Sequence, residues 1–578
     1  MSIPLQKIFP GILTGAWNSE MKRFTAENVV VRLWERDSSL WPADEHELDL
    51  IKNNLCWLDL PDTVPQYISA VVSKCRAAQG EGFDHLVFVG MGASNLAGAA
   101  VLSLYNIRSA RQIQILDTTD PDWIRNLGAN IPIERTLIVF ASKFGKRIET
   151  HGLLLYFLEQ LKLRGIASPG NHFVALTEEN SYLAMLAKAY NFRNVFFDPP
   201  GISSRFSGLI HFGLFLAVVG QVEQSALAQS IMSMKDACGP ATREADNPAP
   251  GLASFLVAGA RQGFHRVILL GCNELVYFAY RIAQLIGNST GGYEPGLMPF
   301  FGQANCPLEI LHRNSLIVIL SMKGHSEVQR EQLRTLREQD LPVLEIELQN
   351  PGDLAAEIFK WEVATALACV PLGINCFQDG EGRGNLGTVS EQLEAITPKR
   401  NATTLEARVK ENGISLYVEG QTRRAISGLS LKGALQTFLE LRNANSYFAI
   451  CPFFELLPHY LDLLRSLRVR ICSTLGVPVQ ISSGPRYLYT LSKVYKEGPA
   501  DGMFIVITSE PAEDVAIPGA SYTFGDLQLS FALQEFESLG KFKKPAIRLH
   551  LLEGPEKGLK QFSDVVIQAL ARIRGDSD

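Results

Sequence analysis

Residues 86–96 read Leu-Val-Phe-Val-Gly-Met-Gly-Ala-Ser-Asn-Leu. This segment is the first clear strand-and-helix unit of the chain and indicates the fold class. It predicts an apolar strand that ends in a glycine turn and passes directly into a helix. Glycines at such a turn let the backbone approach a ligand, and the free amides at the start of a helix attract an anion. Gly92 and Ser94 are therefore candidate ligand-binding residues. The pattern also fits a plain strand-to-helix turn in which Ser94 only caps the helix.

The same alternation of strand and helix continues along almost the whole chain. Short apolar runs alternate with longer segments of helical periodicity, which is typical of parallel sheets with helices on both faces. Strands are predicted at 86–89, 113–116, 136–140, 172–176, 195–197, 267–270, 316–320, 343–346, 447–451, 503–508 and 547–551. Helices are predicted at 209–222, 274–286, 327–338 and 354–368. The predicted fold class is therefore α/β.

Composition and charge argue against several classes of protein. The 578 residues carry 60 acidic and 54 basic side chains, a net charge of -6 that is spread along the chain, so no nucleic-acid partner is expected. The longest apolar stretch, 208–220, is well short of the ~20 residues needed to cross a bilayer, so no membrane association is expected. Residues 1–17 contain no apolar run of secretory length, which predicts the absence of a signal peptide.

The cysteines and the glycine turn bear on metals, cofactors and location. Nine cysteines lie far apart, without a Cys-x-x-Cys pair or a Cys/His cluster of zinc spacing. We therefore expect reduced thiols, no bound metal and a cytoplasmic location. The third glycine and the distal acid of a dinucleotide fingerprint are not clearly placed after residue 92, and no cofactor is expected.

A second loop has the composition of a phosphate site. The strand predicted at 136–140 leads into residues 142–150, which read Ser-Lys-Phe-Gly-Lys-Arg-Ile-Glu-Thr. Cations and hydroxyls around one glycine, at the carboxyl end of a strand, suit a phosphate. The candidate phosphate-binding residues are Ser142, Lys143, Lys146, Arg147 and Thr150. The alternative is a solvated basic turn whose charges pair with Glu149.

These loops resemble those of the phosphoglucose isomerase superfamily of sugar isomerase domains, in particular the isomerase half of bacterial transaldolase/glucose-6-phosphate isomerase fusions. The family's first loop reads G-M-G-G-S-S-L, beside residues 90–96 here, and its phosphate loop reads S-K-S-G-T-T-x-E-T, beside residues 142–150. Further similar segments lie at 116–121, 198–200, 205–207, 288–291, 372–375, 484–488, 517–519 and 522–525. They follow the family's order over nearly the full chain.

The resemblance implies two sugar-isomerase-type domains with parallel sheets, at 62–238 and 252–400, and a ligand between the two sheets at the carboxyl ends of their strands. An N-terminal arm (1–61) that packs against the body is expected before them, because it holds four of the six tryptophans. A C-terminal αβ extension (401–578) is expected after them. Residues 239–251 are rich in turn formers and are the predicted linker.

The resemblance also implies which residues carry the chemistry. The family interconverts an aldose phosphate and a ketose phosphate through an enediol, which requires a base, a ring-opening group and a cation near the oxyanion. Arg205 resembles the family's active-site arginine in position, with a structural ion pair as the alternative. Asn288 stands where the family has the glutamate base of E-S-T-G-K, and an amide cannot take the proton. Lys496 matches a family lysine, with a solvated loop lysine as the alternative.

Other family positions are also changed. The family's histidines correspond to Tyr489 and Tyr495, and Arg383 is the cation closest in sequence to a missing lysine. Glu274 and Glu294 are possible substitute bases, although ordinary surface roles are the alternative for both. His211 is expected to be a core histidine.

Two functions therefore stay open. The first is a glucose-6-phosphate isomerase-like enzyme that acts on a small-molecule sugar phosphate. The second is a catalytically impaired phosphosugar-binding sensor or regulatory subunit, as Asn288 suggests. No pattern in the sequence indicates the oligomeric state or a protein partner.

Overall fold

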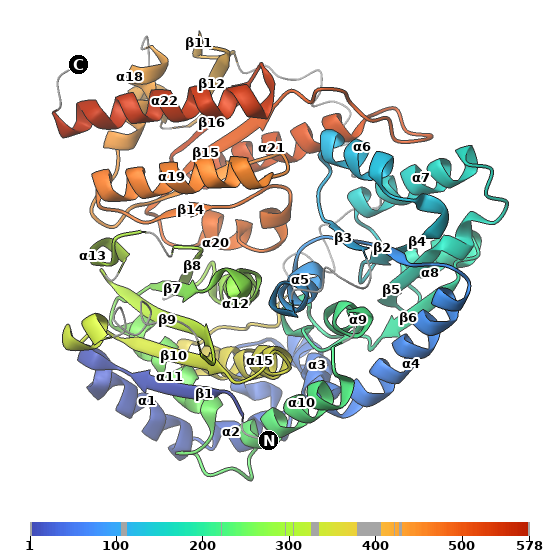
Figure 1. The fold of residues 1–578 in the computed structure, drawn as a ribbon. Helices are drawn as coiled ribbons and strands as arrows, with labels where there is room; N and C mark the ends of the chain where they lie inside the picture. The colour runs from blue at the N-terminus through green and yellow to red at the C-terminus, as the bar shows by residue number, and fades with distance from the viewer. Residues whose placement is uncertain are drawn as a thin grey trace.

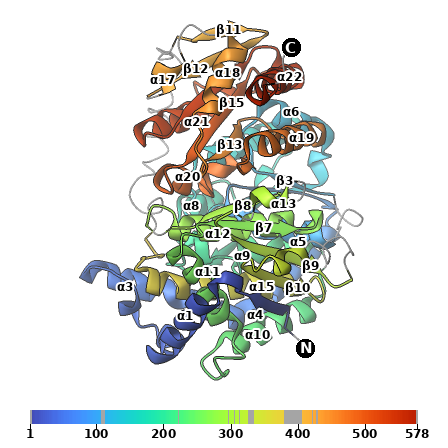
Figure 2. The same cartoon turned by 90° about the vertical axis from the view of Figure 1, so that its left-hand side faces the viewer.

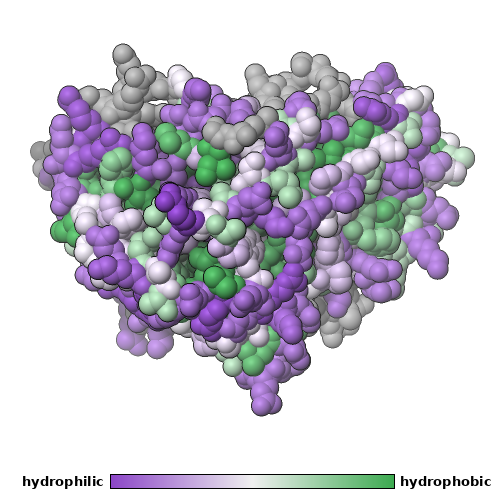
Figure 3. All heavy atoms as spheres, turned by 90° about the horizontal axis from the view of Figure 1, so that it is seen from below, coloured by the Kyte–Doolittle hydropathy of each residue, from purple (hydrophilic) through white to green (hydrophobic). Residues whose placement is uncertain are grey.

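A computed structural model describes residues 3–105, 112–220, 222–294, 296–303, 306–311, 313–324, 334–378, 406–420, 422–426 and 430–575. These residues form three sheets with helices around them (Figures 1 and 2). Within these ranges, no helix is long and apolar enough to cross a membrane. Hydrophilic residues cover most of the face seen in Figure 3, and hydrophobic residues form separate groups on it.

The first sheet, at the right of Figure 1, is entirely parallel. From edge to edge its strands are β3 (Gln112–Leu116), β2 (His85–Gly90), β4 (Thr136–Ala141), β5 (Phe173–Glu178) and β6 (Asn194–Asp198). The helices between successive strands are α5 (Ala93–Tyr105), α6 (Pro121–Asn130), α7 (Ile148–Leu163) and α8 (Tyr182–Ala189), and α9 (His211–Val219) and α10 (Gln224–Cys238) follow. The apolar runs of β2 and β4 are buried almost throughout, as expected for strands covered on both faces.

The second sheet is parallel except for one edge strand. Its strands are β1 (Leu5–Phe9), β10 (Val343–Leu348), β9 (Ser315–Met322), β7 (Arg266–Gly271) and β8 (Met298–Phe301), and β1 runs antiparallel to β10. Its helices include α11 (Pro248–Arg261), α12 (Val276–Thr290), α13 (Leu308–Leu311) and α15 (Asp353–Leu372).

The third sheet lies at the top of Figure 1. Its strands are β11 (Val409–Glu411), β12 (Ile414–Val418), β16 (Ala546–Leu551), β15 (Gly502–Ser509), β13 (Tyr447–Pro452) and β14 (Val479–Ile481). Its helices include α17 (Thr422–Ala425), α18 (Leu431–Glu440), α19 (Pro458–Leu475), α20 (Ser492–Glu497), α21 (Phe524–Lys541) and α22 (Gly554–Arg574). The strands β14, β13, β15 and β16 are parallel, and the hairpin of β11 and β12 adds an antiparallel edge.

All three sheets share one core topology. The first parallel strand of each lies between the second and the third, and the fourth lies beyond the third, in the orders β3-β2-β4-β5, β8-β7-β9-β10 and β14-β13-β15-β16. The direction of winding reverses between the first and third strands, and a crevice opens there at the carboxyl ends. The predicted α/β class with parallel sheets is confirmed, and the expected αβ extension repeats the topology of the other two sheets.

The N-terminal segment contains α1 (Thr14–Ala26), α2 (Val29–Trp34) and α3 (Glu45–Asn54), and the predicted boundary at residues 61 and 62 falls in the first turn of α4 (Leu60–Gly80). As its tryptophans predict, it packs against the body. The Trp41 Nε1 donates to the carbonyl of Ala366 at 3.1 Å, and Trp57 stacks on Phe206 with 5.1 Å between ring centroids. This segment also supplies β1, a strand that the sequence pattern did not predict.

All eleven predicted strands are present, within one or two residues of the expected ends. The short strands β8, β11, β12 and β14 were not predicted. The end of the predicted linker was wrong, because α11 begins at Pro248. Asn247 caps this helix by accepting from the Ala249 N–H at 3.1 Å, and proline fits the first turn because it needs no donor there. The helix predicted at 327–338 lies partly outside the described residues.

Candidate functional site

The two predicted ligand-binding loops lie side by side, because β2 and β4 are neighbouring parallel strands. The chain leaves β2 at Gly90 and enters α5 at Ala93, and it leaves β4 at Ala141 and enters α7 at Ile148. This is the point where the winding of the first sheet reverses, a common position for ligands in α/β proteins. The backbone of Ser94 lies in the first turn of α5, and its side chain is outside the described part of the structure.

Ser142 and Gly145 fix the shape of the loop after β4. The Gly145 N–H donates to Ser142 Oγ at 3.1 Å, and Thr177 Oγ1 donates to the Ser142 carbonyl at 2.7 Å. Gly145 has a φ of 67°, and a Cβ there would lie 2.1 Å from the backbone nitrogen of Leu183. Only glycine fits this position, so the loop is held in one shape against α8.

The three cations of this loop have different surroundings. The Lys143 Nζ lies 3.3 Å from the carboxylate of Glu178, so its charge is balanced within the fold. Lys146 is exposed. The Arg147 guanidinium lies 3.7 Å from the centroid of the Tyr489 ring, a cation–π contact. Lys146 and Arg147 stand directly before the first turn of α7, and Arg147 is its N-cap residue.

The first turn of α7 has properties of an anion site. No side chain caps it, and its first backbone N–H groups have no partner within the helix. Thr150 lies in this turn and is 3% exposed, and its Oγ1 makes no hydrogen bond with any residue that the structure describes. Backbone amides, a free hydroxyl and two nearby cations together suit an anion such as a phosphate.

Tyr489 connects both loops to α12. It ends the short 3₁₀ helix Arg486–Tyr489, and its hydroxyl donates to the carboxylate of Glu149. Its carbonyl accepts a hydrogen bond from the Asn288 Nδ2 at 3.4 Å. Burial and the negative charge of Glu149 raise the pKa of the Tyr489 phenol well above its ordinary value. The phenol therefore keeps its proton at neutral pH.

The glycine turn after β2 makes room for this tyrosine. Gly92 has a φ of 78°, and a Cβ there would lie 2.8 Å from the Cβ of Tyr489. A residue with a side chain would be strained in this backbone conformation and would collide with the tyrosine. The structure thus gives Gly92 a neighbour that the sequence pattern did not predict.

Asn288 lies beside Tyr489, near the end of α12. Its side-chain amide donates a hydrogen bond there, and an amide neither accepts nor releases a proton near neutral pH. The structure therefore brings Gly92, Arg147 and Asn288, three of the predicted residues, together around one tyrosine.

Arg205 is buried and bonded to the backbone. Its guanidinium donates to the carbonyl of Cys376 at 2.5 Å and to that of Gln378 at 2.7 Å. These bonds hold the segment that follows α15, a structural task for which the forked guanidinium is well suited. Both of these partners are carbonyl oxygens. Arg383, the candidate replacement for a family lysine, lies outside the described residues.

Lys496 lies on α20 and faces α21. Its Nζ is 3.3 Å from the carboxylate of Glu535, which is 4% exposed. The neighbouring Tyr495 is buried, and its hydroxyl lies 2.6 Å from Ser482 Oγ. Both side chains are thus engaged with their own part of the fold.

The remaining candidates for an acid–base role are two glutamates and a histidine. Glu274 and Glu294 are both exposed. The side chain of His211, at the start of α9, is outside the described part of the structure. Two residues of this site, Glu149 and Tyr489, were not predicted to take part in it. Glu149 lies inside the segment 142–150, and Tyr489 stands where the family has a histidine, so the resemblance offered a signal for both.

No protein-family model matches the chain. The glucose-6-phosphate isomerase of Borreliella burgdorferi is 28% identical over 157 residues, which is 26% of this chain and 29% of that protein. The probable glucose-6-phosphate isomerase of Haloquadratum walsbyi is 26% identical over 244 residues, 42% of this chain and 55% of that protein. The chain thus spans less than two thirds of the length of these curated relatives.

Among solved structures, a glucose-6-phosphate isomerase from Chlamydia trachomatis is similar over 64% of this chain and 77% of its own, with 19% identity and a TM-score of 0.45.

Proposed function

We propose that this chain, which its sequence matches assign to the phosphoglucose isomerase superfamily, is a glucose-6-phosphate isomerase-like protein that binds a sugar phosphate at the loops after β2 and β4. The phosphate group is held at the first turn of α7. Its ligands are backbone amides of that turn, the hydroxyls of Ser142 and Thr150, and the cations Lys146 and Arg147. The backbone of Gly92 borders the same site.

The observation that carries this proposal is the uncapped start of α7. A buried Thr150 hydroxyl without a described partner, next to unpaired backbone amides, is costly unless a ligand satisfies it. Lys146 and Arg147 add positive charge at the same end of the helix, where the helix dipole also favours an anion. A phosphate satisfies all of these groups at once.

The activity proposed first is aldose–ketose isomerisation, with Glu149 as the base. Its carboxylate takes the proton from one carbon and returns it to the neighbouring carbon, while the Tyr489 phenol keeps its own proton and holds the carboxylate by a hydrogen bond. The second candidate is binding without turnover. It is favoured by Asn288, whose amide lies at the site but cannot act as a base.

Binding is tested by calorimetry with glucose 6-phosphate, with glucose as the phosphate-free comparison. Arg147→Ala should weaken binding about tenfold or more, because one charged hydrogen-bond donor is lost. Arg164→Ala is the matched control, since Arg164 lies at the opposite end of α7 and pairs with Glu134 at 3.1 Å. Equal affinity of both variants, or no binding by the native chain, contradicts the proposed site.

Turnover is tested by a coupled assay for fructose 6-phosphate conversion. Ordinary enzyme rates in the native chain that are lost in Glu149→Gln support isomerisation by the Glu149–Tyr489 pair. Binding without turnover, together with activity gained in Asn288→Glu, supports the second candidate. Turnover that Glu149→Gln leaves unchanged rules out the proposed proton carrier.

A further inference from the structure

Tyr489 belongs to the third-sheet part of the chain, but it completes a site at the loops of the first sheet. It lies on the short 3₁₀ helix Arg486–Tyr489, which follows β14 and comes before α20. Its hydroxyl donates to the Glu149 carboxylate in the first turn of α7, and its ring contacts the Arg147 guanidinium. The tyrosine can hold that carboxylate only if its own 3₁₀ turn is fixed relative to the first sheet.

Arg486, at the start of the same short helix, makes a bidentate contact with the first sheet. Its Nε and Nη2 atoms donate to the two carboxylate oxygens of Asp117, each at 2.5 Å. Asp117 directly follows β3, and its side chain is 11% exposed, against 18% for that of Arg486. A forked guanidinium that meets both oxygens of one carboxylate fixes orientation as well as distance. The Arg486–Asp117 pair therefore holds the turn in one position on the first sheet.

The geometry of the 3₁₀ helix directs Arg486 and Tyr489 to the same side. Such a helix has about three residues per turn, so side chains three positions apart lie one above the other. The first reaches Asp117 after β3, and the second reaches Glu149 at the start of α7. Tyr487, which lies between them, is fully buried instead. One turn thus contacts the first sheet at two points, and the position of Arg486 determines where the Tyr489 hydroxyl lies.

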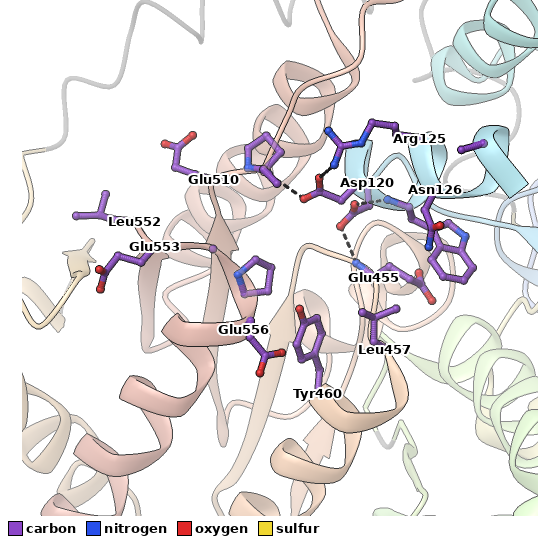
Figure 4. Close-up of a pocket in the computed structure, with 17 residues that line it drawn as sticks. Asp120, Arg125, Asn126, Glu455, Leu457, Tyr460, Glu510, Leu552, Glu553 and Glu556 are labelled. Carbon is purple, nitrogen blue, oxygen red and sulfur yellow. Dashed lines mark hydrogen bonds and ion pairs between the residues drawn. The ribbon is translucent and has the colours of Figure 1, made fainter. Parts of the chain in front are cut away.

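A second contact fixes the same edge of the first sheet. Asp120 caps α6 by accepting from the Trp123 N–H at 2.9 Å, and its other oxygen accepts from the Glu455 N–H at 2.8 Å (Figure 4). The Glu455 carboxylate also lies 3.7 Å from the Arg486 guanidinium. Burial alone would lower the pKa of this guanidinium, but the charges of Asp117 and Glu455 raise it well above its ordinary value. Arg486 therefore stays charged, and its turn is held against a fixed edge.

We infer that Arg486 and Asp117 are positioning residues of the candidate site. Together they place the 3₁₀ turn so that the Tyr489 phenol meets the Glu149 carboxylate and its ring meets the Arg147 guanidinium. Neither positioning residue is a proposed ligand of the sugar phosphate, so their effect on it is transmitted through Tyr489. Their part in catalysis rests on the proposed function, in which Glu149 is the base, whereas the placement of Tyr489 does not.

Loss of the pair should release the Tyr489 phenol from its carboxylate. The charged groups beside the phenol are Glu149 and Arg147, and burial together with Glu149 keeps its pKa well above the ordinary value of 10.0. A phenol that moves into water titrates near its ordinary value. The titration of this one phenol therefore reports whether the turn is still in place.

The first test follows Tyr489 by NMR, in the full chain labelled with carbon-13 at the ζ carbon of tyrosine. The Tyr489 signal is identified by its absence in Tyr489→Phe. Between about pH 8 and pH 10 it should stay unchanged in the native chain and should move toward the phenolate position in Asp117→Asn and Arg486→Lys. Asparagine keeps the shape of Asp117 without its charge, and lysine keeps the charge of Arg486 without its fork.

Arg193→Lys is the matched control. Arg193 also binds one carboxylate with two nitrogens, that of Glu81 at 2.9 and 2.8 Å. It directly precedes β6, so it lies at the opposite edge of the first sheet from the candidate site. This variant loses a paired arginine but should leave the Tyr489 signal unchanged. Urea unfolding of every variant shows that it is folded under the conditions of the NMR experiment.

The second test is the coupled assay with glucose 6-phosphate. If the native chain turns over, Asp117→Asn and Arg486→Lys should each lower kcat about tenfold or more and change KM less, because a misplaced base slows the chemical step. Arg193→Lys should leave both constants unchanged.

The inference is overturned if the Tyr489 signal in Asp117→Asn and Arg486→Lys stays as in the native chain, or if Arg193→Lys changes it equally. An active chain whose kcat both variants leave unchanged overturns it as well. A native chain that neither binds nor converts the sugar phosphate overturns the proposed function alone, since the NMR comparison still decides what holds Tyr489.

Discussion

Replacing Gly92 by alanine tests the packing on which the candidate site depends. The φ of 78° costs an alanine about 1–2 kcal/mol. The new Cβ would also lie 2.8 Å from the Cβ of Tyr489, and such overpacking typically costs about 1–3 kcal/mol. We therefore expect Gly92→Ala to lower the free energy of unfolding by about 2–5 kcal/mol.

The contact can be separated from the backbone strain. Because the closest atom is the tyrosine Cβ, only Tyr489→Gly removes the collision completely. In that background Gly92→Ala should cost no more than the strain, about 1–2 kcal/mol, so the two substitutions should couple by about 1–3 kcal/mol. Gly476→Ala is the matched control, since Gly476 has a φ of 68° and nothing within 4 Å of a Cβ.

The assay is urea unfolding followed by circular dichroism, with the midpoints compared at a common slope. Gly476→Ala should show the strain alone. The reasoning is refuted if Gly92→Ala destabilises the chain equally in the native and Tyr489→Gly backgrounds, or if it costs no more than Gly476→Ala.

Three further predictions concern single side chains. The folded-state pKa of Glu455, about 7, lies above its ordinary value of 4.5, so the folded chain keeps a proton that the unfolded chain releases. The contribution of Glu455 to the free energy of unfolding is therefore fully present below about pH 4.5 and is lost as the pH rises toward 7. The urea midpoint of the native chain should fall over this pH range, and that of Glu455→Gln should not show this fall. Lys496→Met should lower the free energy of unfolding by about 1 kcal/mol, because the contact with Glu535 is lost. The affinity for glucose 6-phosphate, measured by calorimetry, should not change. A weaker affinity would show that Lys496 takes part in binding. Arg205→Lys should destabilise the chain by about 1–3 kcal/mol in urea, because lysine cannot bond both carbonyls, and unchanged stability would contradict its structural role.

The sequence predicted those parts of the fold in which local pattern and burial agree. The strands β2 and β4 are continuous apolar runs because both faces are covered, and such runs are visible without any tertiary information. The three-residue strands β11 and β14 are too short for a pattern to emerge. β1 was missed because its residues are exposed or only partly buried and its partner strand is distant in the chain.

Local pattern predicted the candidate site only where its residues follow an apolar strand, whereas Asn288 was predicted from the family resemblance. Gly92 and the segment 142–150 each follow an apolar strand, which marks them as loops at the carboxyl edge of a sheet. The contact of Tyr489 with Glu149 joins residues hundreds of positions apart, and no spacing rule relates them. The carbonyl partners of Arg205 could not be predicted from the sequence either. Every residue has a carbonyl group, and only the tertiary fold decides which one accepts the hydrogen bond.

The position of β1 has a consequence for how the second sheet is completed. Phe9 pairs with Val343, so this edge forms by closure of a very long loop, and such contacts form late and raise the contact order of the fold. Until β1 docks, the outer side of β10 presents a row of unpaired backbone groups, which is a template for strand addition from another molecule. Docking of Leu5–Phe9 pairs the outer side of β10 and removes this template in the folded chain.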